Sequence, residues 1–228
     1  MISGRDATVI AVGALLVQVP AARLASFLVL GSANPGHADP ATSPASILFC
    51  VLLVPSLAGV AWVWFFGVWG ERDGWHRIAM RWPTRATVIR SLIGGLVAVL
   101  LVNIVVQLTP ASLGEPKGPP IPFNLQTDGS VFVFKLVYLL GAVIAAPIFE
   151  EMVFRGVLFG WMRQRFAFLG SAVIAALPHA AVHGDPAALP ALTAAFILFA
   201  WLREREGTLA APIIAHGAHN AIVLMMNA

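Results

Sequence analysis

Residues 149–156, Phe-Glu-Glu-Met-Val-Phe-Arg-Gly, place two adjacent carboxylates and an arginine inside a run that is otherwise apolar. Charged side chains at membrane depth are costly without partners or water, so they mark a functional site by default. In a helix, Glu151 and Arg155 stand at i and i+4 with the acid first, which is the favourable order for an ion pair. Glu150 then points to a different face and is free to face a cavity. The alternative for this stretch alone is a buried ion pair that only fixes helix packing.

The composition is that of an integral membrane protein. Hydrophobic residues make up 59% of the 228 and charged residues only 11%, and the mean hydropathy is +0.85, whereas a soluble domain carries about 25% charged residues. The net charge is +3, and the lysines and arginines cluster in short segments between apolar runs. This pattern favours signals that set the membrane topology over nucleic-acid binding. A single cysteine, Cys50, leaves no intrachain disulfide and no cysteine metal site.

The apolar runs predict an all-α fold, a polytopic transmembrane bundle of about seven spans. One crossing takes about 20 apolar residues. The predicted spans are residues 7–30, 47–69, 88–108, 131–161, 168–183, 187–202 and 209–226. The first is longer than the apolar part of a signal peptide, which favours a retained span. The fourth exceeds one straight crossing, so residues 131–142 are expected to form an oblique or broken extension, with a kink at Pro147.

The connectors between these runs set the expected topology. Residues 31–46 carry no lysine or arginine, residues 109–129 are proline-rich and cannot form a helix, and five arginines follow the second span. The positive-inside rule puts this basic loop in the cytoplasm, with the amino terminus inside and the carboxyl terminus outside. We divide the single membrane domain into amino-terminal spans and connectors, residues 1–130, and a core, residues 131–228.

Polar side chains recur at one depth in three of the predicted spans. Counted at 1.5 Å per residue from the inner boundary, Glu150 and the later groups lie in one band about 12 to 22 Å deep. The later groups are His179, His183, His216 and Asn220. His179 and His183 are four residues apart, as are His216 and Asn220, so each pair projects from one helix face. The sequence therefore predicts that acid, imidazole and amide groups converge.

These motifs resemble the CPBP family of intramembrane proteases, which includes the CAAX prenyl endopeptidases and the Abi proteins. Residues 150–155 match its Glu-Glu-x-x-x-Arg motif, with the typical Gly156 after it, and residues 216–220 match its His-x-x-x-Asn motif. Residues 207–213, Gly-Thr-Leu-Ala-Ala-Pro-Ile, also look like the family. The resemblance covers the chain from about residue 131 to its end and implies a CAAX-protease-like core.

The middle motif of the family, Phe-x-x-x-His, is not matched. If His183 is the motif histidine, His179 stands at the phenylalanine position, and if His179 is, that position is Ala175. The distance from Arg155 favours His183. The role of His179 then stays open.

The resemblance implies a hydrolase, an intramembrane endopeptidase whose catalytic residues are Glu150, Glu151, Arg155, His183, His216 and Asn220. Glu150 with His183 would polarise a water for attack on the scissile carbonyl. Glu151 and Arg155 would hold the helix and the local charge, and His216 with Asn220 would stabilise the oxyanion. The implied substrate is a peptide or protein with a hydrophobic or prenylated carboxyl-terminal segment, met within a bilayer that is expected to be the bacterial plasma membrane.

Two alternatives remain from the sequence. In a metalloprotease, zinc would be held by residues from the set Glu150, His179, His183 and His216, although no His-Glu-x-x-His string is present, and we favour a glutamate-type enzyme that requires no metal. The other alternative is a non-catalytic membrane protein, either a bacteriocin-immunity factor or a small transporter. A transporter would use the buried charges as an ion path, but the lack of a detectable internal repeat counts against it.

Overall fold

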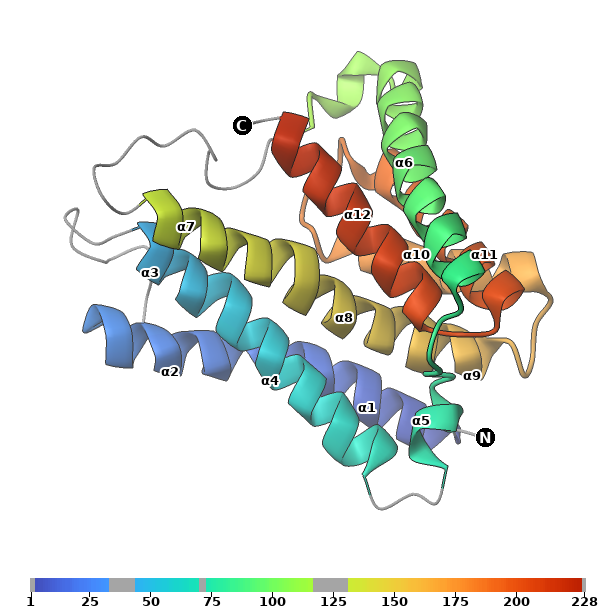
Figure 1. Ribbon diagram of the computed structural model, residues 1–228, viewed down its shortest axis with the longest axis horizontal. Coiled ribbons are helices and arrows are strands. Elements are labelled where there is room, and N and C mark those ends of the chain that lie inside the picture. Colours follow the sequence, from blue (N-terminus) through green and yellow to red (C-terminus); the bar gives the residue numbers. More distant parts are fainter. Residues whose placement is uncertain (1–2, 33–43, 70–72, 117–130, 227–228) are drawn as a thin grey trace.

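The structure, a computed structural model, describes residues 3–32, 44–69, 73–116 and 131–226, and over these residues it contains helices and no strand. Most of the predicted connectors 31–46 and 109–129, and the start of the basic loop, lie outside the described residues. The main helices are residues 4–30 (α1, Gly4–Leu16, and α2, Gln18–Leu30), residues 44–68 (α3, Pro44–Leu48, and α4, Val54–Val63, with π-helical turns), α6 (Arg85–Leu108), residues 131–162, α10 (Phe168–Ala181), α11 (Leu189–Glu206) and α12 (Ala210–Met226). Figure 1 shows them as one bundle.

The prediction of an all-α helical bundle is confirmed, and its helices follow the predicted spans to within a few residues. By length and composition, four helices can cross a membrane: residues 4–30, 46–68, 85–108 and 132–162. The other three are different in kind. α10 and α12 are shorter apolar helices, and α11 ends in the charged sequence Arg-Glu-Arg-Glu.

The expected oblique or broken extension is not broken, because residues 131–162 form one continuous central helix. It consists of α7 (Val131–Tyr138), a π-helical segment (Leu139–Ala145), α8 (Ala146–Glu151), a second π-helical segment (Met152–Phe159) and α9 (Gly160–Met162). Pro147 lies in the first turn of α8, directly after a π-helical segment, where its missing N–H is most easily tolerated. At about 1.5 Å per residue the helix exceeds a hydrocarbon core of about 30 Å, so it must tilt or project beyond it.

α12 is held between α6 and the central helix by close backbone contacts (Figure 1). A Cβ atom on Gly95 of α6 would lie 2.6 Å from the carbonyl oxygen of Ala215, and one on Gly217 would lie 2.7 Å from that of Val143. Glycine at these positions therefore lets the helix backbones touch, as small residues do in membrane bundles. The lateral position of α12 is fixed from two sides.

The turn before α12 is held by a segment far away in the sequence. The Leu209 N–H donates to the Ala79 carbonyl at 2.8 Å. The Thr208 hydroxyl donates to the Arg81 carbonyl at 2.8 Å and accepts from the Arg81 N–H at 3.2 Å. Ala79 has a φ of 54°, a left-handed conformation that non-glycine residues seldom adopt. These contacts attach the segment after α5 (Gly74–Arg77) to the start of α12.

Candidate active site

The ion pair predicted within the central helix is present and fully buried. Arg155 Nη1 lies 3.1 Å from Glu151 Oε1, and both side chains have no solvent exposure. Arg155 also donates from Nη2 to the Phe196 carbonyl of α11 at 2.8 Å, and its guanidinium lies 4.9 Å from the centre of the Phe196 ring. The buried charge is thus both neutralised and fixed in orientation.

His179, near the end of α10, is enclosed by aromatic rings. Its imidazole stacks on Phe196 at 3.7 Å with an interplanar angle of 4° and on Phe154 at 4.1 Å with an angle of 8°. Its Nε2 lies 3.0 Å from Glu150 Oε2, and its Nδ1 contacts Arg155 Nη1. A guanidinium can only donate hydrogen bonds, so Nδ1 must accept and the proton must sit on Nε2. His179 is therefore a neutral histidine that donates to Glu150.

His216 of α12 bridges the two carboxylates. Its Nδ1 lies 2.9 Å from Glu151 Oε1, and its Nε2 lies 3.6 Å from Glu150 Oε2. Because a carboxylate accepts, Nδ1 carries a proton, which leaves Nε2 as the nitrogen that can gain or lose one. Both histidines thus direct their Nε2 atoms toward the same oxygen of Glu150.

Together these side chains close a ring of contacts across three helices. The order around the ring is Glu150, His179, Arg155, Glu151, His216 and back to Glu150. The Glu150 side chain is 20% exposed, whereas those of Glu151 and Arg155 are completely buried. Glu150 is therefore the carboxylate of the pair that a small molecule can approach.

His179 is the histidine that hydrogen-bonds to Glu150. His183, preferred from the sequence, has a ligand atom within 4.8 Å of those of Glu150 and His179, so its pairing with Glu150 through a water stays a prediction. α10 ends at Ala181, so His183 lies beyond the helix on an exposed turn. Its Nδ1 donates to the His179 carbonyl at 2.9 Å, and its ring centre lies 5.6 Å from that of His179. His183 thus stands at the edge of the ring of contacts rather than within it.

Asn220 lies one turn after His216 on α12 but bonds to the central helix. Its Nδ2 donates to the Ala142 carbonyl at 2.7 Å, within the first π-helical segment. An amide nitrogen carries two N–H groups, so one remains to bind a ligand. Acid and imidazole groups thus meet, whereas the amide contacts Ala142, about two turns before Glu150 on the central helix.

The aromatic rings around His179 are the part of the site that the sequence analysis missed. Phe154 lies inside the first motif, but nothing distinguished Phe196 from an ordinary packing residue of a membrane span. Only the fold shows that both stack on the same imidazole.

Among the described residues, Glu150, His179 and His183 offer ligand atoms that all lie within 4.8 Å of one another. A metal ion needs the lone pair of a ring nitrogen, and the nitrogen that His179 directs at Glu150 carries the proton. His179 can therefore ligate a metal there only if it gives up its contact with Arg155. A metal site made of Glu150, His183 and His216 would not require the loss of the contact between His179 and Arg155.

Comparison with known proteins identifies the segment that carries this site. Residues 132–222 match a family model described as "Type II CAAX prenyl endopeptidase Rce1-like", and no curated protein and no solved structure matches the chain significantly. The matched residues include the central helix, α10, α11 and most of α12, and thus every member of the ring of contacts. Over residues 132–222, this membrane protein is thus similar to the Rce1-like type II CAAX prenyl endopeptidases.

Proposed function

We propose that this chain is an intramembrane endopeptidase that hydrolyses a peptide bond near a hydrophobic or lipidated carboxyl-terminal segment of its substrate. The observation that carries the proposal is the environment of Glu150. Its Oε2 accepts a hydrogen bond from a neutral His179, lies 3.6 Å from Nε2 of His216, and remains partly exposed. A carboxylate held in this way suits a general base that activates water.

The charges of the site favour one shared proton. Two carboxylates, Glu150 and Glu151, face a single arginine, so one more proton is needed to neutralise the ring. Uncompensated buried charge is costly, and the nearest place for that proton is between His216 Nε2 and Glu150 Oε2. With the proton on His216, Glu150 is a base and His216 is a hydrogen-bond donor.

These positions support the following reaction. Glu150 takes a proton from water as the water oxygen bonds to the scissile carbonyl carbon. The resulting oxyanion accepts hydrogen bonds from His216 Nε2–H and from the second N–H of Asn220. When the carbon–nitrogen bond breaks, the proton held by Glu150 passes to the leaving amine. His179 keeps Glu150 oriented throughout, and Glu151 and Arg155 hold the two histidines.

The proposed mechanism does not require a metal. Zinc bound by Glu150, His183 and His216 is the competing mechanism, with a water in the fourth position. Stoichiometric zinc in the purified protein, lost together with activity on chelation, would establish the metal-assisted mechanism instead.

The matched family model and the apolar helices around the site support a proposal about the substrate class. We propose a peptide or protein whose hydrophobic or prenylated segment lies in the bilayer beside these helices. We further propose that the protein resides in a bacterial plasma membrane with its amino terminus in the cytoplasm.

The test is hydrolysis, by the purified full-length protein in detergent, of peptides with hydrophobic or prenylated carboxyl ends. We expect cleavage that is lost in Glu150→Gln and His179→Ala and retained in His76→Ala, which changes an exposed histidine outside the site. If no peptide is cut, and Glu150→Gln still protects cells from a peptide toxin as well as the wild type does, the protein is an immunity factor and the catalytic proposal fails.

A further inference from the structure

Both glutamates of the charged sequence that ends α11, residues 203–206, are already bound to arginines of other helices. Arg90 of α6 donates to the two carboxylate oxygens of Glu206 at 2.7 and 2.8 Å. Arg163, at the end of the central helix, donates to Glu204 with a shortest contact of 2.7 Å. The two remaining arginines of the sequence therefore have no counter-ion within it.

Arg203 holds a buried donor that has no acceptor. The side chain is half-buried, and its Nε is buried and makes no hydrogen bond. Among the described residues, Arg203 forms no ion pair. Burial lowers the pKa of Arg203 below its usual value; the charge of Glu204 acts against this shift, and the charge of Arg81 adds to it. A buried N–H without an acceptor is costly, so this guanidinium is suited to bind an anion.

The fold brings a second arginine, Arg81, to the same place from far away in the sequence. Its backbone N–H and carbonyl both bond to the Thr208 hydroxyl. Thr208 belongs to the turn that follows α11, where the Gly207 N–H donates to the Arg203 carbonyl at 3.1 Å. The Arg81 side chain is exposed and, over the described part of the chain, also forms no ion pair. Two like charges are thus held close together, and a shared anion would remove their repulsion.

The two arginines lie where a phospholipid headgroup would be expected. Arg203 directly follows the predicted span of residues 187–202, and Arg81 comes shortly before α6. The next residue, Trp82, is 95% exposed, and exposed tryptophans are typical of the headgroup level of a bilayer. Basic pockets between helices at a membrane surface bind anionic head groups. A guanidinium matches phosphate in particular, because its N–H groups can bind two phosphate oxygens at once.

We infer that Arg81 and Arg203 together bind a phosphate group, either that of an anionic phospholipid or that of a water-soluble phosphate. The bound group would join the end of α11 to the segment after α5, beside the start of α12, the helix that carries His216. The inference does not depend on the proposed function, because neither arginine belongs to the ring of contacts around Glu150.

Lipid binding can be measured by native mass spectrometry of the full-length protein in uncharged detergent, which resolves successive lipid molecules and thus reports the tightest site. The probes are phosphatidylglycerol and phosphatidylcholine with the same acyl chains. We expect phosphatidylglycerol to bind more tightly to the wild type. Arg203→Met and Arg81→Met should each weaken the tightest phosphatidylglycerol about tenfold, as loss of a charge-assisted hydrogen bond allows.

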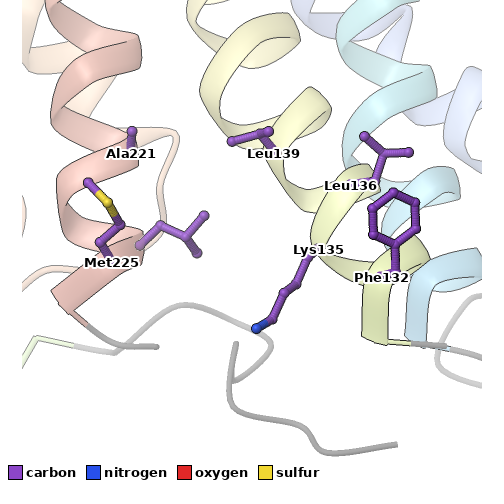
Figure 2. A pocket seen from close by; sticks show the side chains of 7 residues that line it. Phe132, Lys135, Leu136, Leu139, Ala221 and Met225 are labelled. Atoms are coloured by element: carbon purple, nitrogen blue, oxygen red, sulfur yellow. The ribbon is translucent and has the colours of Figure 1, made fainter. Parts of the chain in front are cut away.

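Two controls remove one positive charge elsewhere. Arg205→Met changes the same helix, at an exposed arginine that stands 5.3 Å from the centre of the Trp201 ring. Lys135→Met changes the opposite end of the central helix, where Figure 2 shows the lysine beside an apolar crevice. Both variants should bind the tightest phosphatidylglycerol as the wild type does.

A second measurement distinguishes the two sources of the phosphate. If the site takes a water-soluble phosphate, millimolar inorganic phosphate without added lipid should raise the unfolding temperature of the wild type and not that of Arg203→Met. If it takes only a lipid headgroup, phosphatidylglycerol alone should have this effect. In buffer without either, Arg203→Met should be at least as stable as the wild type, because it removes a cation that has no partner.

Three results would overturn the inference. An equal loss of phosphatidylglycerol binding in Arg203→Met and Arg205→Met would mean that overall charge attracts the lipid. Equal binding of the two lipids to the wild type would mean that only their acyl chains are recognised. An Arg203→Met protein that is destabilised by the same amount with and without phosphate or phosphatidylglycerol would mean that Arg203 only packs the helices. None of these results depends on peptide hydrolysis.

Discussion

Arg155 contacts Nδ1 of His179 in the centre of the bundle, and this contact determines which nitrogen of the imidazole carries the proton. The guanidinium can only donate, so the His179 proton is directed at Glu150. The arginine of the first motif therefore acts on the proposed base through a histidine of another helix. Arg155 is therefore a positioning residue for His179 as well as the ion-pair partner of Glu151.

Removing the charge of Arg155 alone should destabilise the protein strongly. Arg155→Met leaves Glu151 as an unpaired buried charge, which typically costs about 3–5 kcal/mol. The double variant Glu151→Gln with Arg155→Met should recover most of this loss, because neither partner is then charged. Unfolding in detergent measures both values.

The same pair of variants separates packing from positioning. The double variant should remain inactive even though it is folded, because nothing then fixes the His179 proton on Nε2. Recovery of hydrolysis together with stability would show that Arg155 serves packing only.

His179→Ala should lower kcat far more than His183→Ala. Loss of a group that works with a general base costs about 10²–10⁴-fold, whereas His183 bonds to a backbone carbonyl at the edge of the site. Peptide hydrolysis by the two variants, with expression and unfolding as controls, makes the comparison. A larger loss of kcat in His183→Ala would support the assignment of His183, made from the sequence, as the histidine that works with Glu150. If His183→Ala also lost bound zinc, the metal-assisted mechanism would be favoured.

The ion pair between Arg163 and Glu204 gives a dependence on pH. Both residues lie beyond the predicted spans, and three Arg163 nitrogen–Glu204 oxygen contacts of 2.7, 3.2 and 3.2 Å join them. The hydrogen bond from Arg163 lowers the pKa of Glu204 below its usual value. A depressed pKa stabilises the folded state above the pKa of the unfolded chain, and this stability is lost as the pH falls through the folded pKa.

Glu204→Gln should therefore be less stable than the wild type at pH 7 and equal to it once the Glu204 carboxyl is protonated in the wild type. The difference should stay below about 1 kcal/mol, because the pair is partly exposed. Unfolding measured across this pH range tests the prediction. A difference that persists at the lowest pH would mean that the amide disturbs packing rather than charge.

The helices could be predicted from the sequence because a membrane span has a nearly fixed length of apolar residues. Their ends could not, because local capping decides them. α6 begins at Arg85, before the predicted start at residue 88, since the Thr84 hydroxyl accepts from the Thr87 N–H at 3.1 Å. The ion pair of Glu151 and Arg155 follows from helical spacing alone and was predictable.

The choice between His179 and His183 was not predictable, because the two lie on one face and only the end of α10 separates them. The structure places His179 within α10, where Phe154 and Phe196 enclose it in a contact between three helices. Tertiary packing of this kind leaves no periodic signal in the sequence.

Gly217→Ala should reduce both stability and activity. The added Cβ would lie 2.7 Å from the Val143 carbonyl oxygen, so α12 must move away from the central helix. Overpacking of this kind costs about 1–3 kcal/mol. The movement would also lengthen the distance from His216, the preceding residue, to Glu150. Gly170→Ala is the matched control, since its Cβ would meet only a side-chain atom at 3.7 Å. The free energy of unfolding in detergent and the hydrolysis rate should both fall in Gly217→Ala, and neither should change in Gly170→Ala. A destabilised Gly217→Ala protein with an unchanged hydrolysis rate would mean that the His216–Glu150 distance does not limit the reaction.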